Sequence, residues 1–163
     1  MSHSAPATRP GFDFVTACTS LAISHVIWIP DTTTGKWENE LDESPLSLIR
    51  VCREGEAWPL AAGLLISGES PIILIQSTGF FESGDALRNI AHDLQLPVYG
   101  VIGARNWTRT ESTDSAKRYI QPVLESWELD WILLEQSDGF APFVDHYLRC
   151  QALNRPGICL MAE

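Results

Sequence analysis

The acidic groups that precede one small-residue segment are the side chains of this sequence best suited to proton transfer. Glu54 and Glu56 stand at the start of the run AWPLAAG (57–63), which is mostly small and apolar. A carboxylate that faces a dry, tightly packed surface has a raised pKa, and it can then share a proton with a bound base. The alternative is that both carboxylates only favour the dipole at a helix N-terminus and have no chemical role.

Other patterns that often carry chemistry are incomplete in this chain. The segment GFFESGDA (79–86) has the two glycines of a phosphate-binding loop, but Asp85 stands where that loop requires a lysine. Ser77 lacks the flanking glycines of a nucleophile elbow, so it is interpreted as a turn serine. The histidines show no metal-ligand spacing, at His3, His25, His92 and His146. We therefore expect no metal site in this chain.

The elements that must position these residues alternate along the chain. Apolar runs bounded by turn residues predict buried strands at 25–31, 46–52, 71–79, 97–104, 130–136 and 157–162. Apolar residues every three or four positions predict helices at 12–23, 55–67, 83–95, 112–127 and 141–153. This alternation predicts a three-layer α/β/α fold with a six-stranded, mainly parallel sheet.

Two irregular segments follow predicted strands and mark the expected position of a ligand site. They comprise residues 32–45 and 105–112. In open α/β sheets, ligands bind at the edge formed by the carboxyl ends of the strands. We therefore expect the functional side chains to lie in or beside these two loops.

Length and composition indicate a single domain. The 163 residues, 45% of them hydrophobic, suffice for one buried core over 11–163 with a flexible tail over 1–10. No run approaches the roughly 20 apolar residues of a membrane span, and no secretory signal is recognisable, so a cytoplasmic location is expected. The four scattered cysteines are interpreted as reduced thiols. The net charge of -10 argues against nucleic acid as a partner.

The spacing after Glu54 resembles the pyrimidine-binding domain of thiamine diphosphate enzymes. In that domain a glutamate after the second strand precedes a helix with small residues three, seven and nine positions later, where this chain has Ala57, Ala61 and Gly63. The resemblance extends over 53–105 and includes the IPD segment at 29–31. It is strongest to the alpha subunit of sulfopyruvate decarboxylase and the matching domain of phosphonopyruvate decarboxylase, and residues 106–163 are only loosely similar.

The resemblance implies a role for each matching position. Glu54 is expected to be catalytic, by hydrogen bonding to the N1′ nitrogen of the cofactor's aminopyrimidine ring. The cofactor-binding candidates in the following segment are Gln76, Ser77, Thr78, Gly79 and Phe80. The substrate-binding candidates are Asp31, Arg105 and Asn106. An arginine here can attract the acid group of an anionic keto acid, although an ordinary surface arginine is the alternative.

The chain also departs from the family in ways that imply a partner. It lacks the Gly-Asp-Gly segment through which thiamine enzymes hold Mg²⁺ and the diphosphate. The resemblance therefore implies an alpha subunit that shares thiamine diphosphate with a beta subunit holding the Mg²⁺, and that also self-associates. The expected enzyme is a 2-keto acid decarboxylase, active only with its partner chain, for a small anionic substrate such as sulfopyruvate or phosphonopyruvate. Aromatic groups at Trp58, Phe80 and Phe81 are expected at the shared surface.

The sequence is also compatible with two kinds of protein other than a thiamine-dependent decarboxylase. The segment FFES (80–83) and the loop at 106–115 differ from the family, which would suit a non-catalytic binding or regulatory module that retains the fold. The same strand and helix order is also compatible with an unrelated doubly wound domain of the flavodoxin-like kind. Bound flavin would distinguish the latter from a thiamine enzyme.

Overall fold

A computed structural model of the chain describes residues 10–135 and 137–163. Its six strands form one sheet in the order β2-β1-β3-β4-β6-β5, and every neighbouring pair is parallel. The strands are β1 (His25–Trp28), β2 (Ser47–Arg50), β3 (Pro71–Gln76), β4 (Tyr99–Ala104), β5 (Asp130–Leu134) and β6 (Gly157–Ala162). The predicted fold class is therefore confirmed.

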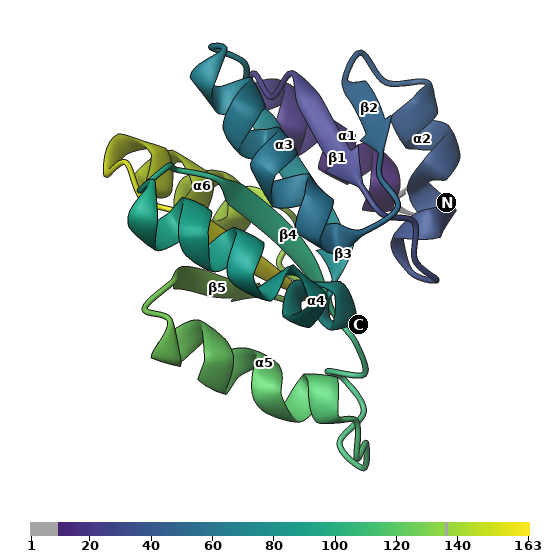
Figure 1. The fold of residues 1–163 in the computed structure, drawn as a ribbon. Coiled ribbons are helices and arrows are strands. Elements are labelled where there is room, and N and C mark those ends of the chain that lie inside the picture. The colour runs from purple at the N-terminus through teal and green to yellow at the C-terminus, as the bar shows by residue number, and fades with distance from the viewer. Residues whose placement is uncertain (1–9, 136) are drawn as a thin grey trace, which may run out of the picture.

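Helices cover both faces of this sheet, as Figure 1 shows. They are α1 (Pro10–Ser20), the short 3-10 helix η1 (Thr34–Trp37), α2 (Glu38–Asp42), α3 (Glu54–Ile66), α4 (Ser77–Arg88), the π-helical turn η2 (Asn89–Asp93), α5 (Ser115–Ser126) and α6 (Ala141–Ala152). Side chains of α1, η1, α2 and α6 share one core cluster, and those of α3, α4, η2 and α5 share the other. The sheet thus lies between two helical layers.

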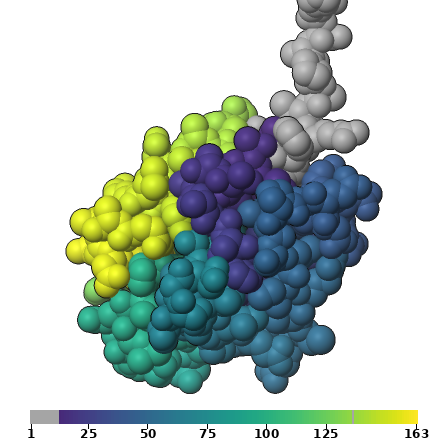
Figure 2. Space-filling model, turned by 90° about the horizontal axis from the view of Figure 1, so that it is seen from above, coloured from purple at the N-terminus to yellow at the C-terminus, as the bar shows by residue number. Residues whose placement is uncertain are grey.

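The central strands explain the position of the core. All six residues of β4 are buried, as are the first five of β3, because both strands carry helices on each face. The edge strand β2 has no buried residue. On one face α1 lies between the chain that follows β1 and the C-terminal segment (Figure 2), and the Phe14 ring packs on Trp37 and Phe143.

The strand order creates a topological switch point between β1 and β3. The chain leaves β1 toward η1 and α2 on one face of the sheet, whereas it leaves β3 toward α4 on the other face. The two connections diverge, and this leaves a crevice at the carboxyl ends of the two strands. This topology predicts that a ligand binds in the crevice at the carboxyl ends of β1 and β3.

Several boundaries differ from the sequence-based expectation. The helix expected over 83–95 begins at Ser77, because Ser77, Thr78 and Gly79 form its first turn instead of the end of β3. Gly84 interrupts this helix with non-helical backbone angles. The loop at 32–45 contains η1 and α2. The tail predicted for 1–10 lies outside the described residues except for Pro10, which begins α1.

No helix in the described part of the chain combines the length and apolar character needed to cross a lipid bilayer. The longest, α3, has 13 residues, whereas a span requires about 20.

Candidate functional site

A cleft of about 470 Å³ lies at the predicted edge of the sheet. It is lined by Asp31, Thr32, Thr33, Gln76, Arg105, Asn106, Arg109 and Glu163. These residues end or follow β1, β3, β4 and β6, so the cleft occupies the switch point and its neighbouring strands. The structure therefore brings together all three substrate-binding candidates and one cofactor-binding candidate, Gln76.

Asp31 organises the loop that forms one wall of the cleft. Its carboxylate accepts hydrogen bonds from the backbone N–H groups of Thr33 (2.6 Å) and Thr34 (2.8 Å) and from the Thr34 hydroxyl (2.7 Å). The Thr34 hydroxyl also accepts a hydrogen bond from the buried indole of Trp28. Asp31 thus joins the end of β1 to η1, and its carboxylate is already engaged by the protein.

Arg105 and Asn106 line the same cleft and share one acidic partner. The Asn106 amide donates to Asp114 at 2.7 Å, and the Arg105 guanidinium pairs with the same carboxylate at 3.2 Å. The N–H of Ala116 and the Asn106 amide hold the pKa of Asp114 below its usual range. Asp114 therefore stays charged, caps α5, and offsets much of the Arg105 charge.

Arg109 is the cation of the cleft whose charge is least offset. Its guanidinium makes no hydrogen bond or ion pair with residues 10–135 or 137–163, whereas its backbone oxygen accepts a hydrogen bond from Lys117. Arg109 falls in the loop predicted at 105–112, but its residue type alone did not distinguish it from a surface arginine. The structure places it in the lining of the cleft together with Arg105.

Glu163 lines the cleft and was not predicted from the sequence. Its carboxyl packs against the bare Cα of Gly103, in space that a Cβ would occupy. One oxygen accepts a hydrogen bond from Gln76 at 3.3 Å, and the other is buried without a hydrogen-bond partner in the described chain. Burial raises the pKa of Glu163, and the nearby Asp31 adds to the shift, although the neighbouring Thr33 and Gln76 oppose it.

A signal for Glu163 existed in the sequence. The residue follows the last apolar run directly, and the carboxyl end of a parallel strand is where ligands bind. Asp31 holds the equivalent position after the first strand, although it was named from the resemblance.

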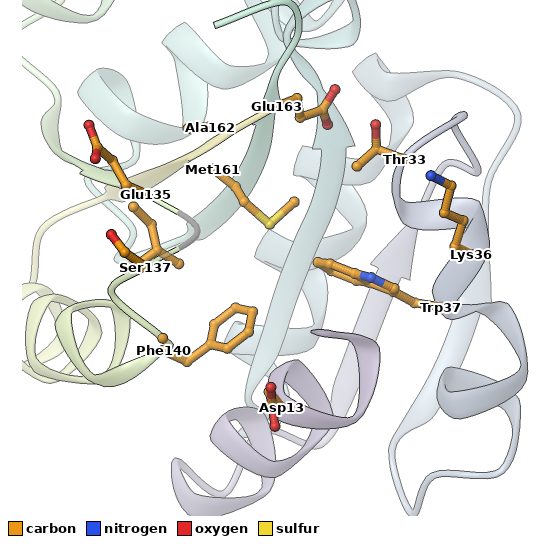
Figure 3. Close-up of a pocket in the computed structure, with 12 residues that line it drawn as sticks. Asp13, Thr33, Lys36, Trp37, Glu135, Ser137, Phe140, Met161, Ala162 and Glu163 are labelled. Atoms are coloured by element: carbon orange, nitrogen blue, oxygen red, sulfur yellow. The ribbon is translucent and has the colours of Figure 1, made fainter. Parts of the chain in front are cut away.

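Glu163 also borders a second, more apolar cavity of about 500 Å³. Figure 3 shows the Met161 side chain between Phe140 and Trp37 in this cavity, with Glu163 and Thr33 at one end. Because Thr33 and Glu163 line both cavities, they separate the charged cleft from an apolar chamber next to it.

Glu54, the predicted catalytic group, begins α3 and lies against α4. Its carboxyl fills the space beside Gly79 where any other residue would place its Cβ. The side chain is partly exposed, and it makes no hydrogen bond to any residue that the structure describes. One turn of α4 separates Gly79 from Gln76, which lines the cleft. The Glu54 carboxyl is thus held by packing and is free to bond to a ligand.

The small residues after Glu54 have two different surroundings. Ala57 and Ala61 are buried, with 0% and 1% of their surface exposed, where α3 packs against the sheet and α4. Gly63 is exposed and has nothing near its Cα. Close approach of α3 to its neighbours therefore depends on the two alanines and not on the glycine.

The segment FFES joins α4 to the start of α3. The Glu82 carboxylate accepts a hydrogen bond from the Gly55 N–H at 2.7 Å and pairs with Arg53 at 2.5 Å. These donors hold the pKa of Glu82 below its usual range, the Arg53 contribution being the larger. Glu82 therefore caps the helix that Glu54 begins, so this residue has a structural role.

The remaining predicted residues of the first turn of α4 differ in their access to ligand. The Ser77 hydroxyl is buried and accepts a weak hydrogen bond from the Arg105 N–H at 3.4 Å, whereas Thr78 is exposed. Phe80 is 0% exposed and packs in the core against Trp127, so its side chain cannot contact a cofactor.

Trp58 is equally buried, so the expectation that Trp58 and Phe80 lie on a partner surface is wrong. Phe81 alone of the three expected aromatic groups is exposed, at 37%.

Comparison of the chain with protein-family models found no matching family. Comparison with curated proteins also found no match.

Proposed function

We propose that this chain is the alpha subunit of a thiamine diphosphate-dependent 2-keto acid decarboxylase, active with a partner chain. The observation that carries the proposal is the position of Glu54. Its carboxyl begins a helix, lies on the bare Cα of Gly79, and has no hydrogen-bond partner in the described chain. A carboxyl held in this way is suited to sharing a proton with a ring nitrogen.

The residues around Glu54 fit an aminopyrimidine ring. Gly79 removes the side chain that would otherwise occupy the Glu54 carboxyl position, so the carboxyl reaches the surface between α3 and α4. Glu54 would hold the proton at the ring nitrogen, and the exposed Thr78 in the first turn of α4 would lie beside the ring. Thiamine diphosphate, when bound, supplies the nucleophilic carbon and the electron sink for loss of carbon dioxide.

The charges of the cleft support a small anionic substrate. Arg105 and Arg109 both line it, and Arg109 has no carboxylate partner within the described residues. An acid group of sulfopyruvate or phosphonopyruvate would bond to these guanidinium groups, since arginine presents several donors to such oxygens. Asp31 acts indirectly, by shaping the loop at Thr33 and Thr34 that lines the cleft.

A partner chain is required by the proposal because this sequence has no Gly-Asp-Gly segment for Mg²⁺ and diphosphate. An open hollow of about 650 Å³ beside Thr78 is lined in part by Phe81, Tyr119 and Val123. Phe81 is 37% and Tyr119 48% exposed. An apolar surface next to the proposed pyrimidine position is where the beta subunit would complete the site.

The test compares two glutamates of the same helical turn. The full chain is affinity-purified from its native cells with any polypeptide that accompanies it, and carbon dioxide release from each keto acid is measured with Mg²⁺ and thiamine diphosphate. We expect cofactor-dependent release that E54Q lowers by about 100-fold or more, whereas E56Q, at an exposed position, leaves it unchanged. Full activity of E54Q would reject the assigned role.

The same purified protein distinguishes the decarboxylase from the two alternatives, a flavodoxin-like domain and a non-catalytic binding module. A yellow, flavin-containing protein would identify a flavodoxin-like domain. A chain that stays monomeric, binds a small anion without a partner and releases no carbon dioxide would be a binding module.

A further inference from the structure

A cluster of metal-ligating side chains lies at the amino edge of the sheet, opposite the cleft. It contains Asp130, the first residue of β5, and His146 and Cys150, both on α6. One ligand atom from each of the three lies within 4.8 Å of the others. From this geometry we propose that Asp130, His146 and Cys150 bind one Zn²⁺ ion.

The spacing on α6 presents two ligands to the same point. His146 and Cys150 are four residues apart, so they occupy one face of the helix. The His146 Nε2 atom lies 3.6 Å from the Cys150 sulfur and 3.1 Å from an Asp130 oxygen. Ligand atoms bound tetrahedrally to zinc, about 2.0–2.3 Å from the ion, are separated by similar distances.

The surroundings favour a bound ion at this position. The His146 Nδ1 atom lies 2.5 Å from the Tyr99 hydroxyl, whose oxygen can accept a hydrogen bond from the Nδ1–H group when Nε2 binds a metal. Both Asp130 contacts, to His146 and to Arg149, use the same oxygen, and the second oxygen makes no hydrogen bond with the described residues. Arg149 can therefore keep its ion pair while one carboxylate oxygen binds zinc.

Gly157 leaves the room that the cluster needs. A Cβ at this position would lie 2.7 Å from the Cys150 sulfur and 2.5 Å from the Tyr99 ring. His146 is 3% and Cys150 0% exposed, whereas the Asp130 side chain is 27% exposed and marks the route of entry.

The donor set selects the metal. A thiolate and an imidazole favour Zn²⁺ over Mg²⁺ or Ca²⁺, and three protein ligands leave the fourth position to water. On binding, the Cys150 thiol proton leaves to solvent, and the His146 ring proton sits on Nδ1. The ion would fasten α6 to β5, independently of any reaction at the cleft.

The test uses the full chain, stripped with a chelator and titrated with Zn²⁺ against a chromophoric competitor. We expect one equivalent to bind per chain, and Co²⁺ to give tetrahedral visible bands together with a thiolate charge-transfer band. C150S should lose the charge-transfer band and at least about 100-fold in affinity, and Y99F about 10-fold, since outer partners contribute 10- to 100-fold. C52S is the matched control, because Cys52 is the exposed cysteine, and it should bind as the parent does.

D130N is a second variant that tests the site if C150S fails to fold. Residue 130 is partly exposed, so we expect the fold to tolerate an amide there. Loss of affinity in D130N with unchanged circular dichroism supports the site. Absence of stoichiometric binding in the parent chain, or equal binding by the parent, C150S and D130N, would overturn it. Neither result depends on decarboxylase activity.

Discussion

The carboxyl group of Glu54 occupies the space beside the Cα of Gly79 that a side chain at residue 79 would need. Two helices that are adjacent on one face of the sheet thus depend on each other at their first turns. Glycine is needed at position 79 because of this close approach. Its backbone conformation does not require glycine, since Gly79 has no positive φ and lies in the regular first turn of α4.

The first prediction concerns this contact. G79A should lower the free energy of unfolding by about 1–3 kcal/mol, because the new methyl displaces the Glu54 carboxyl. The loss should be smaller when Glu54 is also changed to alanine, and a double-mutant cycle in urea measures this coupling. G63A is the control: nothing lies near Gly63, so alanine there should stabilise α3 by about 0.5–1 kcal/mol. Additive effects at 54 and 79 would show that the carboxyl moves away without strain.

The second prediction concerns the pH dependence of stability. Burial raises the pKa of Glu163 above its ordinary value of 4.5, so the folded chain holds this proton more tightly than the unfolded chain. Stability is therefore lost as the pH rises from about 4.5 through the raised pKa, with a slope of at most about 1.4 kcal/mol per pH unit. E163Q, which retains the acceptor for Gln76, should be more stable than the parent at neutral pH and equal to it in acid.

Urea unfolding of both proteins across the pH range measures this difference. The carboxyls with lowered pKa, such as Asp114 and Glu82, destabilise parent and variant equally in acid and so cancel in the comparison. A pH-independent difference would mean that Glu163 titrates normally.

The third prediction separates two roles of Asp31. D31A removes the acceptor for the N–H groups of Thr33 and Thr34 and for the Thr34 hydroxyl. We expect it to cost about 0.5–2 kcal/mol, as the loss of a helix cap does. D31N keeps an acceptor oxygen and should retain most of the stability. If D31N nevertheless lowers keto acid turnover in the assembled enzyme, the Asp31 charge acts on substrate; unchanged turnover limits the residue to shaping the loop.

The fourth prediction concerns the free cation of the cleft. R109Q should change the free energy of unfolding by no more than about 0.5 kcal/mol, because the guanidinium contacts no carboxylate in the described chain. In the assembled decarboxylase it should raise KM for an anionic keto acid. Arg118, which lies over the Tyr119 ring on α5, supplies the control R118Q with unchanged KM. Equal KM values for the parent and R109Q would place the substrate's acid group elsewhere.

The sequence predicted the edge of the sheet where the site lies, because that edge depends on strand ends, whereas the individual residues were named from the resemblance. Asp31, Gln76 and Arg105 each end or follow an apolar run, and parallel strands bring such residues to one edge whatever their order in the sheet. The extent of α4 was not predictable in the same way. Ser77, Thr78 and Gly79 suit either a turn or a helix start, and packing against α3 decides between them.

The sequence alone determined the number of strands, their parallel arrangement and the edge where ligand-facing groups gather, because apolar runs and their spacing are local properties of the chain. Only the tertiary structure decided which distant residues meet. Glu163 reaches Gly103 and Gln76 because β6 lies between β4 and β5, and His146 reaches Asp130 because α6 crosses back over β5. Such contacts depend on strand order and helix packing, which arise from the burial of all the apolar faces together.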